Sequence, residues 1–145
     1  MKELKVGVVG LGLLGELHIG QLQNEIAGVR VTAVCDIFEK RVAEIQEKYD
    51  IPNGYTDYDE MIDKSGIDTV FIITNVQAHK EQVIKACKAK LNIFVEKPLS
   101  LDVDECHEIE KAVEENKGKV FMIAFMRRFD PSYAAAKKAV DAGEI

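Results

Sequence analysis

The stretch VGVVGLGLLGELH, residues 6–18, joins an apolar run to a helical pattern through three glycines. Gly10, Gly12 and Gly15 form a G-x-G-x-x-G loop, the arrangement in which a strand turns into the first helix of a dinucleotide-binding fold. Gly10 would permit the tight turn, Gly12 a close approach of the backbone to a pyrophosphate, and Gly15 close packing of helix on strand. The backbone N–H groups at the helix start, at Leu13 and Leu14, would then face the phosphates.

An acidic residue follows the second apolar run at the spacing expected for ribose recognition. Asp36 lies 21 positions after Gly15, directly after the run Val29–Cys35, where a carboxylate accepts hydrogen bonds from the adenosine ribose hydroxyls. A 2′-phosphate about 4 Å from this carboxylate would be repelled by roughly 4 kcal/mol per unit charge at an effective dielectric constant near 20. Arg41, one helical turn further on, would offset this repulsion only partly. The sequence therefore predicts NAD as the cofactor rather than NADP.

The same glycines have other interpretations. A glycine-rich turn without a ligand is the simplest, but here the strand, the helix and the strand-end acid all follow in the expected order. A methyltransferase also carries a glycine loop after its first strand, and only the later motifs argue against it. A P-loop is excluded, because the sequence contains no G-x-x-x-x-G-K-[ST].

Apolar runs alternate with helical patterns along the whole chain. The expected strands are Leu4–Val9, Val29–Cys35, a short Gly54–Thr56, Thr69–Ile73, Asn92–Val95 and Val120–Ala124. The expected helices are Leu13–Glu25, Phe38–Tyr49, Tyr58–Lys64, Ala78–Lys90, Val103–Asn116 and Pro131–Ala142, with Asp57 and Asp102 as N-caps. Strands buried on both faces, each followed by a helix, predict an α/β fold. We expect a single domain over residues 1–145: a doubly wound parallel sheet of the Rossmann type, in the order 3-2-1-4-5-6.

Composition narrows the partners and the compartment. Hydrophobic residues make up 47% of the 145 residues and charged residues 30%, as in a soluble globular domain. The net charge is −6 and no basic cluster stands out, so we expect no nucleic-acid partner. Three isolated cysteines without a CxxC pair fit a reduced, cytoplasmic setting, and we expect no metal. No apolar run reaches the ~20 residues needed to cross a bilayer, so no membrane role is expected.

Polar motifs follow the fourth, fifth and sixth strands. In TNVQAH, residues 74–79, Thr74 and Asn75 fall at the carboxyl end of a strand, the rim where such sheets bind ligands. His79, in the first turn of the next helix, is by itself a surface or packing residue. Lys97 of the sequence EKP would by itself be solvated. A cofactor that excluded water from it could shift its pKa into a range useful for acid–base chemistry. FMRRFDP, residues 125–131, is typical of a solvated turn with an Arg–Asp pair.

Taken in order, the glycine loop, Asp36, TNVQAH, EKP and AFMRRFDP resemble the Gfo/Idh/MocA oxidoreductase family, and within it the inositol dehydrogenases. The resemblance covers the whole chain. Many dehydrogenases share the glycine loop, whereas EKP joined to FMRRFDP is more specific. Asn75 departs from the pattern, because many members carry proline there. The family implies NAD(P)-dependent oxidation of a polyol or sugar hydroxyl to a ketone.

The resemblance also implies roles for individual residues. Lys97 would be the catalytic residue: it would contact the nicotinamide ribose and orient or deprotonate the substrate hydroxyl. The Lys97–Pro98 peptide bond is expected to be cis. The other positions so implied are Thr74 and Asn75 lining the cofactor, Glu96 beside the nicotinamide ribose, His18 and His79 near the cofactor, and Arg127 facing the substrate.

Family members also contain a second α/β domain. It supplies the residues that complete proton transfer, and it forms most of the sugar pocket. We therefore expect this chain to be the NAD-binding half of an oxidoreductase, lacking the C-terminal substrate domain and inactive by itself. The full-length protein would act on a small polyol or sugar and form a homo-oligomer. The alternative is a stand-alone NAD-binding or regulatory module without catalysis.

Overall fold

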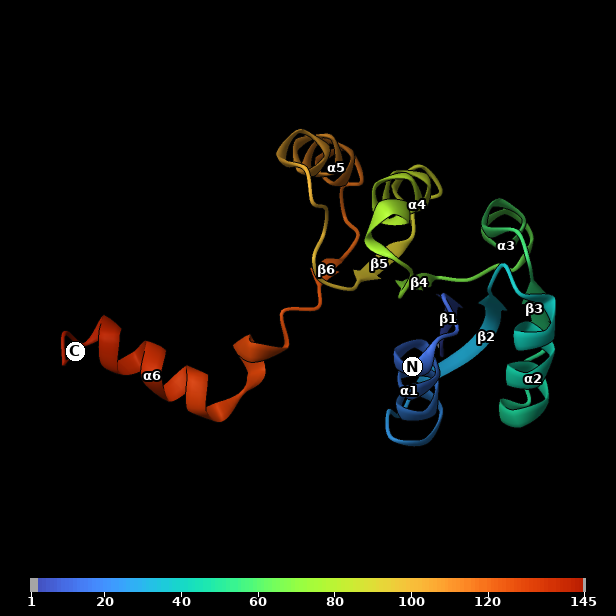
Figure 1. The fold of residues 1–145 in the computed structure, drawn as a ribbon, viewed down its shortest axis with the longest axis horizontal. Helices are drawn as coiled ribbons and strands as arrows, with labels where there is room; N and C mark the ends of the chain where they lie inside the picture. The colour runs from blue at the N-terminus through green and yellow to red at the C-terminus, as the bar shows by residue number, and fades with distance from the viewer. Residues whose placement is uncertain (1–2, 145) are drawn as a thin grey trace.

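The computed structural model describes residues 3–144 and contains a six-stranded sheet in which every strand pairing is parallel. The strands lie in the order β3-β2-β1-β4-β5-β6. Their bounds are β1 Leu4–Val9, β2 Val29–Cys35, β3 Asn53–Tyr55, β4 Thr69–Ile72, β5 Asn92–Val95 and β6 Phe121–Ile123. The predicted fold class and strand order are confirmed (Figure 1).

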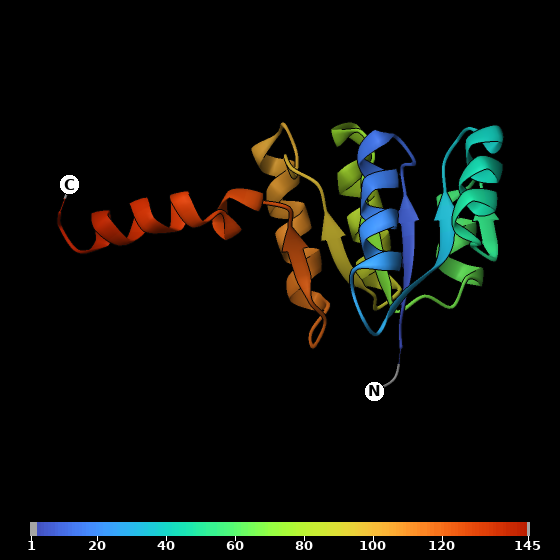
Figure 2. The same ribbon diagram turned by 90° about the horizontal axis from the view of Figure 1, so that it is seen from below.

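Helices cover the sheet on both faces (Figures 1 and 2). On one face lie α1 (Leu13–Asn24) and α2 (Glu39–Tyr49), and on the other α3 (Tyr58–Lys64), α4 (Val76–Lys88) and α5 (Val103–Glu115). Each layer closes an apolar core, one including side chains of α1 and α2 and the other side chains of α3, α4 and α5. The central strands β1 and β4 contribute to both cores, so their carboxyl ends are fixed by packing from both faces.

Helix starts follow the residues that cap them. Asp57 and Asp102 cap α3 and α5 by accepting hydrogen bonds from first-turn N–H groups, as predicted. Helix α4 begins at Val76, two residues before the predicted start, because Asn75 already has the extended backbone of an N-cap. Apolar spacing does not reveal this first turn. The other predicted elements agree with the structure to within one residue at each end.

The last part of the described chain leaves the body of the domain (Figures 1 and 2). After β6, a 3-10 helix η1 (Met126–Phe129) stands where a turn was expected. Helix α6 (Pro131–Asp141) begins at its predicted first residue, with Asp130 as its N-cap, and none of its residues is buried. No helix of residues 3–144 covers β5 and β6 on the α1 side (Figure 1), and Phe129 is 71% exposed.

Within residues 3–144, no helix is long and apolar enough to cross a membrane. The three cysteines carry free thiols, and Cys35 and Cys87 are buried. Burial, together with the nearby carboxylates of Asp36 and Asp57, raises the pKa of Cys35 to about 12. Among the same residues, no cluster of three or more histidine, cysteine or acidic side chains could hold a metal ion.

Candidate functional site

The glycine loop between β1 and α1 leaves no room for a side chain at two of its three glycines. Gly10 has φ of +89°, and a Cβ there would lie 2.5 Å from the carbonyl oxygen of Ile73. A Cβ on Gly15 would lie 1.9 Å from the carbonyl oxygen of Gly10, so α1 packs directly on the end of the strand. A Cβ on Gly12, in contrast, would have no atom within 4 Å among residues 3–144 other than those of Gly12 and its chain neighbours. Internal packing does not require glycine at this position, and the space beside it is open to a ligand.

The first turn of α1 presents backbone donors beside this open space. Gly12 is the N-cap, and within the described part of the chain no side-chain hydrogen bond caps the helix. First-turn N–H groups lack partners within a helix, and the helix dipole places a partial positive charge there. The N–H groups of Leu13 and Leu14 belong to this turn, as predicted. This helix end therefore has the donors and the charge to hold a pyrophosphate.

The Asp36 carboxylate joins the end of β2 to the glycine loop. Its Oδ2 accepts a hydrogen bond from the Leu11 N–H at 2.8 Å, and its Oδ1 accepts one from the Phe38 N–H at 3.1 Å. A carboxylate has about four acceptor sites, so both oxygens keep a free lone pair. The half-buried carboxylate can therefore also accept hydrogen bonds from ribose hydroxyls.

A pocket of about 340 Å³, here called the Asp36 pocket, opens at the carboxyl ends of β1, β2 and β4. Five residues predicted to bind the cofactor line it: Gly10, Gly12, Asp36, Thr74 and Asn75. This is the crevice beside the strand-order reversal, where doubly wound sheets bind dinucleotides. The structure thus brings the glycine loop, the strand-end acid and the β4 rim to one place.

Other residues of the Asp36 pocket were not predicted. Ile37 and Phe38 line it and are 80% and 67% exposed, giving the pocket an apolar edge. Gln82 lines it from α4, and its Oε1 accepts a hydrogen bond from the Thr74 hydroxyl at 2.6 Å. Gln82 lies one helical turn after Ala78, which also lines the pocket. Helical spacing from the β4 rim could have identified this pair.

A second pocket, here called the Glu96 pocket, lies between α1 and the ends of β5 and β6 and has a volume of about 360 Å³. Leu14, His18 and Glu96 line it. Glu96 is 8% exposed; its Oε1 lies 3.4 Å from His18 Nε2, and its Oε2 accepts a hydrogen bond from the Lys97 N–H at 3.0 Å. The structure thus brings His18 and Glu96 together, across the first turn of α1 from Asp36.

His79 lies beneath the rim and is 1% exposed. Its Nδ1 is 2.9 Å from the carbonyl oxygen of Pro98, and its Nε2 is 3.2 Å from that of Thr74. The side chain therefore bridges the segments that follow β4 and β5. The residue-based prediction of a packing role agrees with this position, and contact with the cofactor remains a prediction from the resemblance.

Lys97 and Arg127 line neither of the two pockets, although each directly follows a residue that lines the Glu96 pocket. Lys97 is exposed after β5, and the Lys97–Pro98 bond is cis as predicted. Arg127 is on η1 with a side chain 64% exposed; it pairs with Asp130 at 3.0 Å and lies 4.9 Å from the ring centre of Tyr133. The predicted Arg–Asp pair is confirmed. Neither Lys97 nor Arg127 is among the residues that line the Asp36 and Glu96 pockets.

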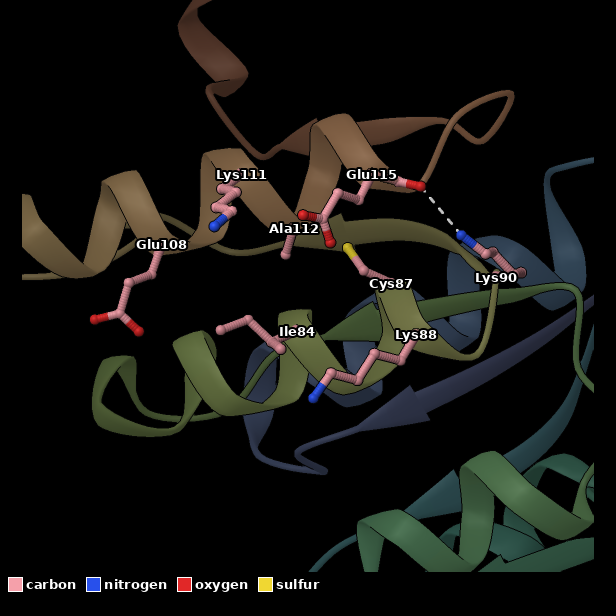
Figure 3. Close-up of a pocket in the computed structure, with 8 residues that line it drawn as sticks. All are labelled: Ile84, Cys87, Lys88, Lys90, Glu108, Lys111, Ala112 and Glu115. Atoms are coloured by element: carbon pink, nitrogen blue, oxygen red, sulfur yellow. Dashed lines mark hydrogen bonds between the residues drawn. The ribbon is translucent and has the colours of Figure 1, made fainter.

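Another pocket, of about 360 Å³, lies between α4 and α5 (Figure 3). Lysine and glutamate side chains surround it, and the Lys90 ammonium donates a hydrogen bond to the backbone carbonyl of Glu115 at 3.1 Å. No predicted site residue lines it. Because it lies between helices rather than at the carboxyl ends of strands, we do not assign it to the dinucleotide.

Comparison with known proteins agrees with this geometry. The Gfo/Idh/MocA family model, described as "Oxidoreductase family, NAD-binding Rossmann fold", matches residues 4–125. The inositol 2-dehydrogenase of Salmonella typhimurium is 36% identical over 143 residues, which cover 98% of this chain and 43% of that protein. Sequence similarity and the glycine loop therefore point to the same kind of domain.

Solved structures are similar over almost the whole chain. Myo-inositol 2-dehydrogenase from Lactobacillus plantarum matches with a TM-score of 0.92 and 40% identity, over 99% of this chain and 42% of that one. Scyllo-inositol dehydrogenase from Lactobacillus casei, solved with bound NAD(H) and scyllo-inositol, matches with a TM-score of 0.93 and 31% identity, over the same shares. The chain spans less than half the length of these relatives. It belongs to the Gfo/Idh/MocA oxidoreductase family and is an NAD-binding Rossmann domain of that family.

Proposed function

We propose that this chain holds NAD in a dehydrogenase that moves a hydride between the cofactor and a hydroxyl of inositol or a related polyol or sugar. The open space beside Gly12, bordered by the uncapped start of α1 and by the Asp36 carboxylate, carries the proposal. Inositol dehydrogenases among the relatives support the substrate class, and one of them was solved with NAD(H) and scyllo-inositol.

The Asp36 pocket and the Glu96 pocket would bind different parts of the dinucleotide. N–H groups of the first turn of α1 would hold the pyrophosphate, and Asp36 would accept hydrogen bonds from the adenosine ribose. Thr74 and Asn75 would line the cofactor at the β4 rim. Glu96 would lie beside the nicotinamide ribose, in the pocket that it shares with His18. NAD supplies the hydride chemistry when it is bound.

Lys97 is our candidate for the group that handles the substrate hydroxyl. Its backbone N–H is held by the Glu96 carboxylate at 3.0 Å, which fixes the backbone of Lys97 next to the Glu96 pocket. From there the ammonium would orient the hydroxyl or, once desolvated, take up its proton. Arg127 would face the substrate. Arg127 lies on η1, which has no buried residue, and no contact among residues 3–144 places it at a pocket wall of the proposed site. We therefore propose its contact with the substrate on the resemblance alone.

We also propose that NAD is preferred over NADP, because a 2′-phosphate would approach the Asp36 carboxylate. Fluorescence titration with NADH and NADPH tests both the site and the preference. NADH should bind at least about tenfold more tightly, since the expected repulsion exceeds the 1.4 kcal/mol that corresponds to tenfold. Asp36→Asn keeps the shape of the side chain and should narrow the difference between the affinities for NADH and NADPH. Equal or tighter binding of NADPH would contradict the preference, and absence of NADH binding would contradict the site.

One observation favours the second candidate, an NAD-binding module without catalysis. Lys97, the proposed catalytic residue, is exposed and lies outside both pockets. An assay of NAD reduction with a panel of polyols, on this chain and on any longer form from the same gene, separates the candidates. Turnover by neither form, despite NADH binding, would favour the module.

A further inference from the structure

We propose that Glu16, on α1, is a second determinant of cofactor choice, because it binds the Arg41 guanidinium and withholds that cation from a 2′-phosphate. The inference rests on the proposed NAD site. It adds a residue that is neither one of the loop glycines nor the strand-end acid. It also explains how a basic side chain can stand beside the ribose site without making the site accept NADP.

Arg41 lies directly beside the glycine loop. Its Nε donates a hydrogen bond to the carbonyl oxygen of Leu11 at 2.8 Å, and the N–H of Leu11 donates to Asp36. One loop residue therefore connects the guanidinium to the carboxylate that would bind the ribose. An arginine near that carboxylate is the group that accommodates the 2′-phosphate in NADP-binding Rossmann domains.

The guanidinium is already engaged by carboxylates. Its Nη2 forms an ion pair with Glu16 Oε2, in which the Arg41 and Glu16 side chains are 30% and 20% exposed. Its Nη1 lies 3.3 Å from Glu44 Oε2, but Glu44 is 51% exposed and belongs to the same helix. Exposed pairs of that kind contribute little. Of the two carboxylates, Glu16 is therefore the one that holds the guanidinium of Arg41.

Glu16 itself is fixed in this position. Its Oε1 accepts hydrogen bonds from the Lys48 ammonium at 2.7 Å and from the Tyr49 hydroxyl at 3.3 Å. Hydrogen bonds from Lys48 and Arg41 lower the pKa of Glu16 to about 2, so the carboxylate is ionised at neutral pH. A 2′-phosphate would thus meet the Asp36 carboxylate together with an arginine that already has a partner.

The arrangement predicts that the effects of substitutions are not additive. Asp36→Asn alone removes the direct repulsion but leaves Arg41 bound to Glu16. Adding Glu16→Gln weakens the ion pair while keeping an acceptor for Lys48 and Tyr49. The guanidinium then becomes available to the phosphate, and charge-assisted hydrogen bonds of this kind are stronger than neutral ones.

The test is a fluorescence titration of Asp36→Asn variants with NADH and NADPH. Adding Glu16→Gln should raise the affinity for NADPH about tenfold, a change of 1.4 kcal/mol, and leave the affinity for NADH within about twofold. Adding Arg41→Met as well should abolish the gain. Glu110→Gln is the matched control, because it removes one carboxylate from the exposed surface of α5 and should give no gain.

Each other outcome has a defined meaning. No gain with Glu16→Gln, or an equal gain when Arg41 is replaced or when Glu110 is changed, overturns the inference. If Glu16→Gln fails to fold, Glu16→Asp keeps the charge but shortens the reach to the guanidinium; it should give a smaller gain, and no gain there overturns the inference. Failure of the unmodified protein to bind NADH would instead contradict the proposed function.

Discussion

At the scale of single residues, Gly12 and Gly15 test whether each loop position serves the ligand or the fold. Gly12→Ala adds a methyl group into open space, with no atom of residues 3–144 beyond its chain neighbours within 4 Å, and φ is −66°, so the stability should stay within about 1 kcal/mol. NADH affinity should fall at least about tenfold, because the methyl group enters the proposed pyrophosphate space. Gly15→Ala places a methyl group 1.9 Å from a backbone oxygen and should cost about 1–3 kcal/mol.

Urea unfolding and NADH titration of the same two variants separate these roles. The expected pattern is a stable Gly12→Ala that binds NADH poorly and a destabilised Gly15→Ala. If Gly12→Ala instead bound NADH like the parent protein, the open space beside Gly12 would not be the pyrophosphate site.

A further residue-scale prediction concerns pH and Glu16. Its pKa is about 2 in the folded protein against 4.5 ordinarily, chiefly because Lys48 and Arg41 donate hydrogen bonds to it. A carboxyl group whose pKa is lower in the folded than in the unfolded protein stabilises the fold above about pH 4.5. This stabilisation is lost as the pH falls towards 2 and the carboxylate becomes protonated. Glu16→Gln should therefore cost about 1 kcal/mol at pH 7 and less at pH 3, since partly exposed ion pairs contribute modestly. Urea unfolding at both pH values measures the difference, and a cost that does not change with pH would contradict this view.

Sequence reasoning succeeded for residues whose spacing along the chain reflects local geometry. The three glycines and Asp36 follow from the strand–turn–helix–strand order, and the structure places Gly10, Gly12 and Asp36 at one pocket. It did not identify the partner of Arg41, because Glu16 is 25 positions away on another helix. Such side-chain pairs depend on how α1 and α2 are set on the sheet, which periodicity does not encode.

At the scale of elements, regular segments were predictable and irregular ones were not. Val/Ile-rich strands and capped helices carry periodic signals, so β1, β2 and α3 have the predicted bounds. The 3-10 helix η1, four residues long, is too short to show a period and was expected to be a turn. The burial of His79 also depends on the segments after β4 and β5 meeting in space; both segments were identified from the sequence, but their spacing along the chain does not encode this contact.

His79 is the side chain that joins two of these elements. His79→Leu would keep the volume but remove the contacts to the carbonyl oxygens of Thr74 and Pro98. Because a neutral imidazole has a single N–H, it donates to only one of these carbonyl oxygens, and loss of that hydrogen bond should cost about 1–3 kcal/mol of stability. NADH affinity should fall too, since Thr74 belongs to the Asp36 pocket. His79→Gln retains a donor and should recover part of both losses, measured by urea unfolding and NADH titration; equal losses in the two variants would assign His79 to packing alone.

At the scale of the whole molecule, the described chain has one sheet half that is covered on a single face. Met126 and Phe129 are 61% and 71% exposed beside β6, and α6 contributes no buried residue. The helical pattern of residues 131–142 was correctly interpreted, but a pattern does not tell what an apolar face packs against. Exposed apolar surface of this kind marks interaction sites, and here it adjoins the Glu96 pocket, which Met126 and Phe129 line.

The last prediction is that the 145-residue chain binds NADH but does not oxidise polyols at a useful rate. Hydride transfer needs the alcohol carbon within about 3–3.5 Å of the nicotinamide, and such positioning can contribute roughly 7–11 kcal/mol. It also needs a base for the hydroxyl proton, typically worth ~10²–10⁴-fold. Lys97 is the candidate base, but it is exposed to water, and neither it nor Arg127 lines the Glu96 pocket.

An assay of NADH formation from NAD with a panel that includes myo-inositol measures this directly, alongside an NADH titration of the same preparation. We expect saturable NADH binding and turnover many decades below that of an intact dehydrogenase, because both the positioning and the proton-transfer contributions are lost. Lys97→Ala is the matched variant, and it should change neither the NADH affinity nor the low turnover by much. Robust turnover that disappears in Lys97→Ala would instead show that the rim formed by Glu96 and Lys97 completes an active site within these residues.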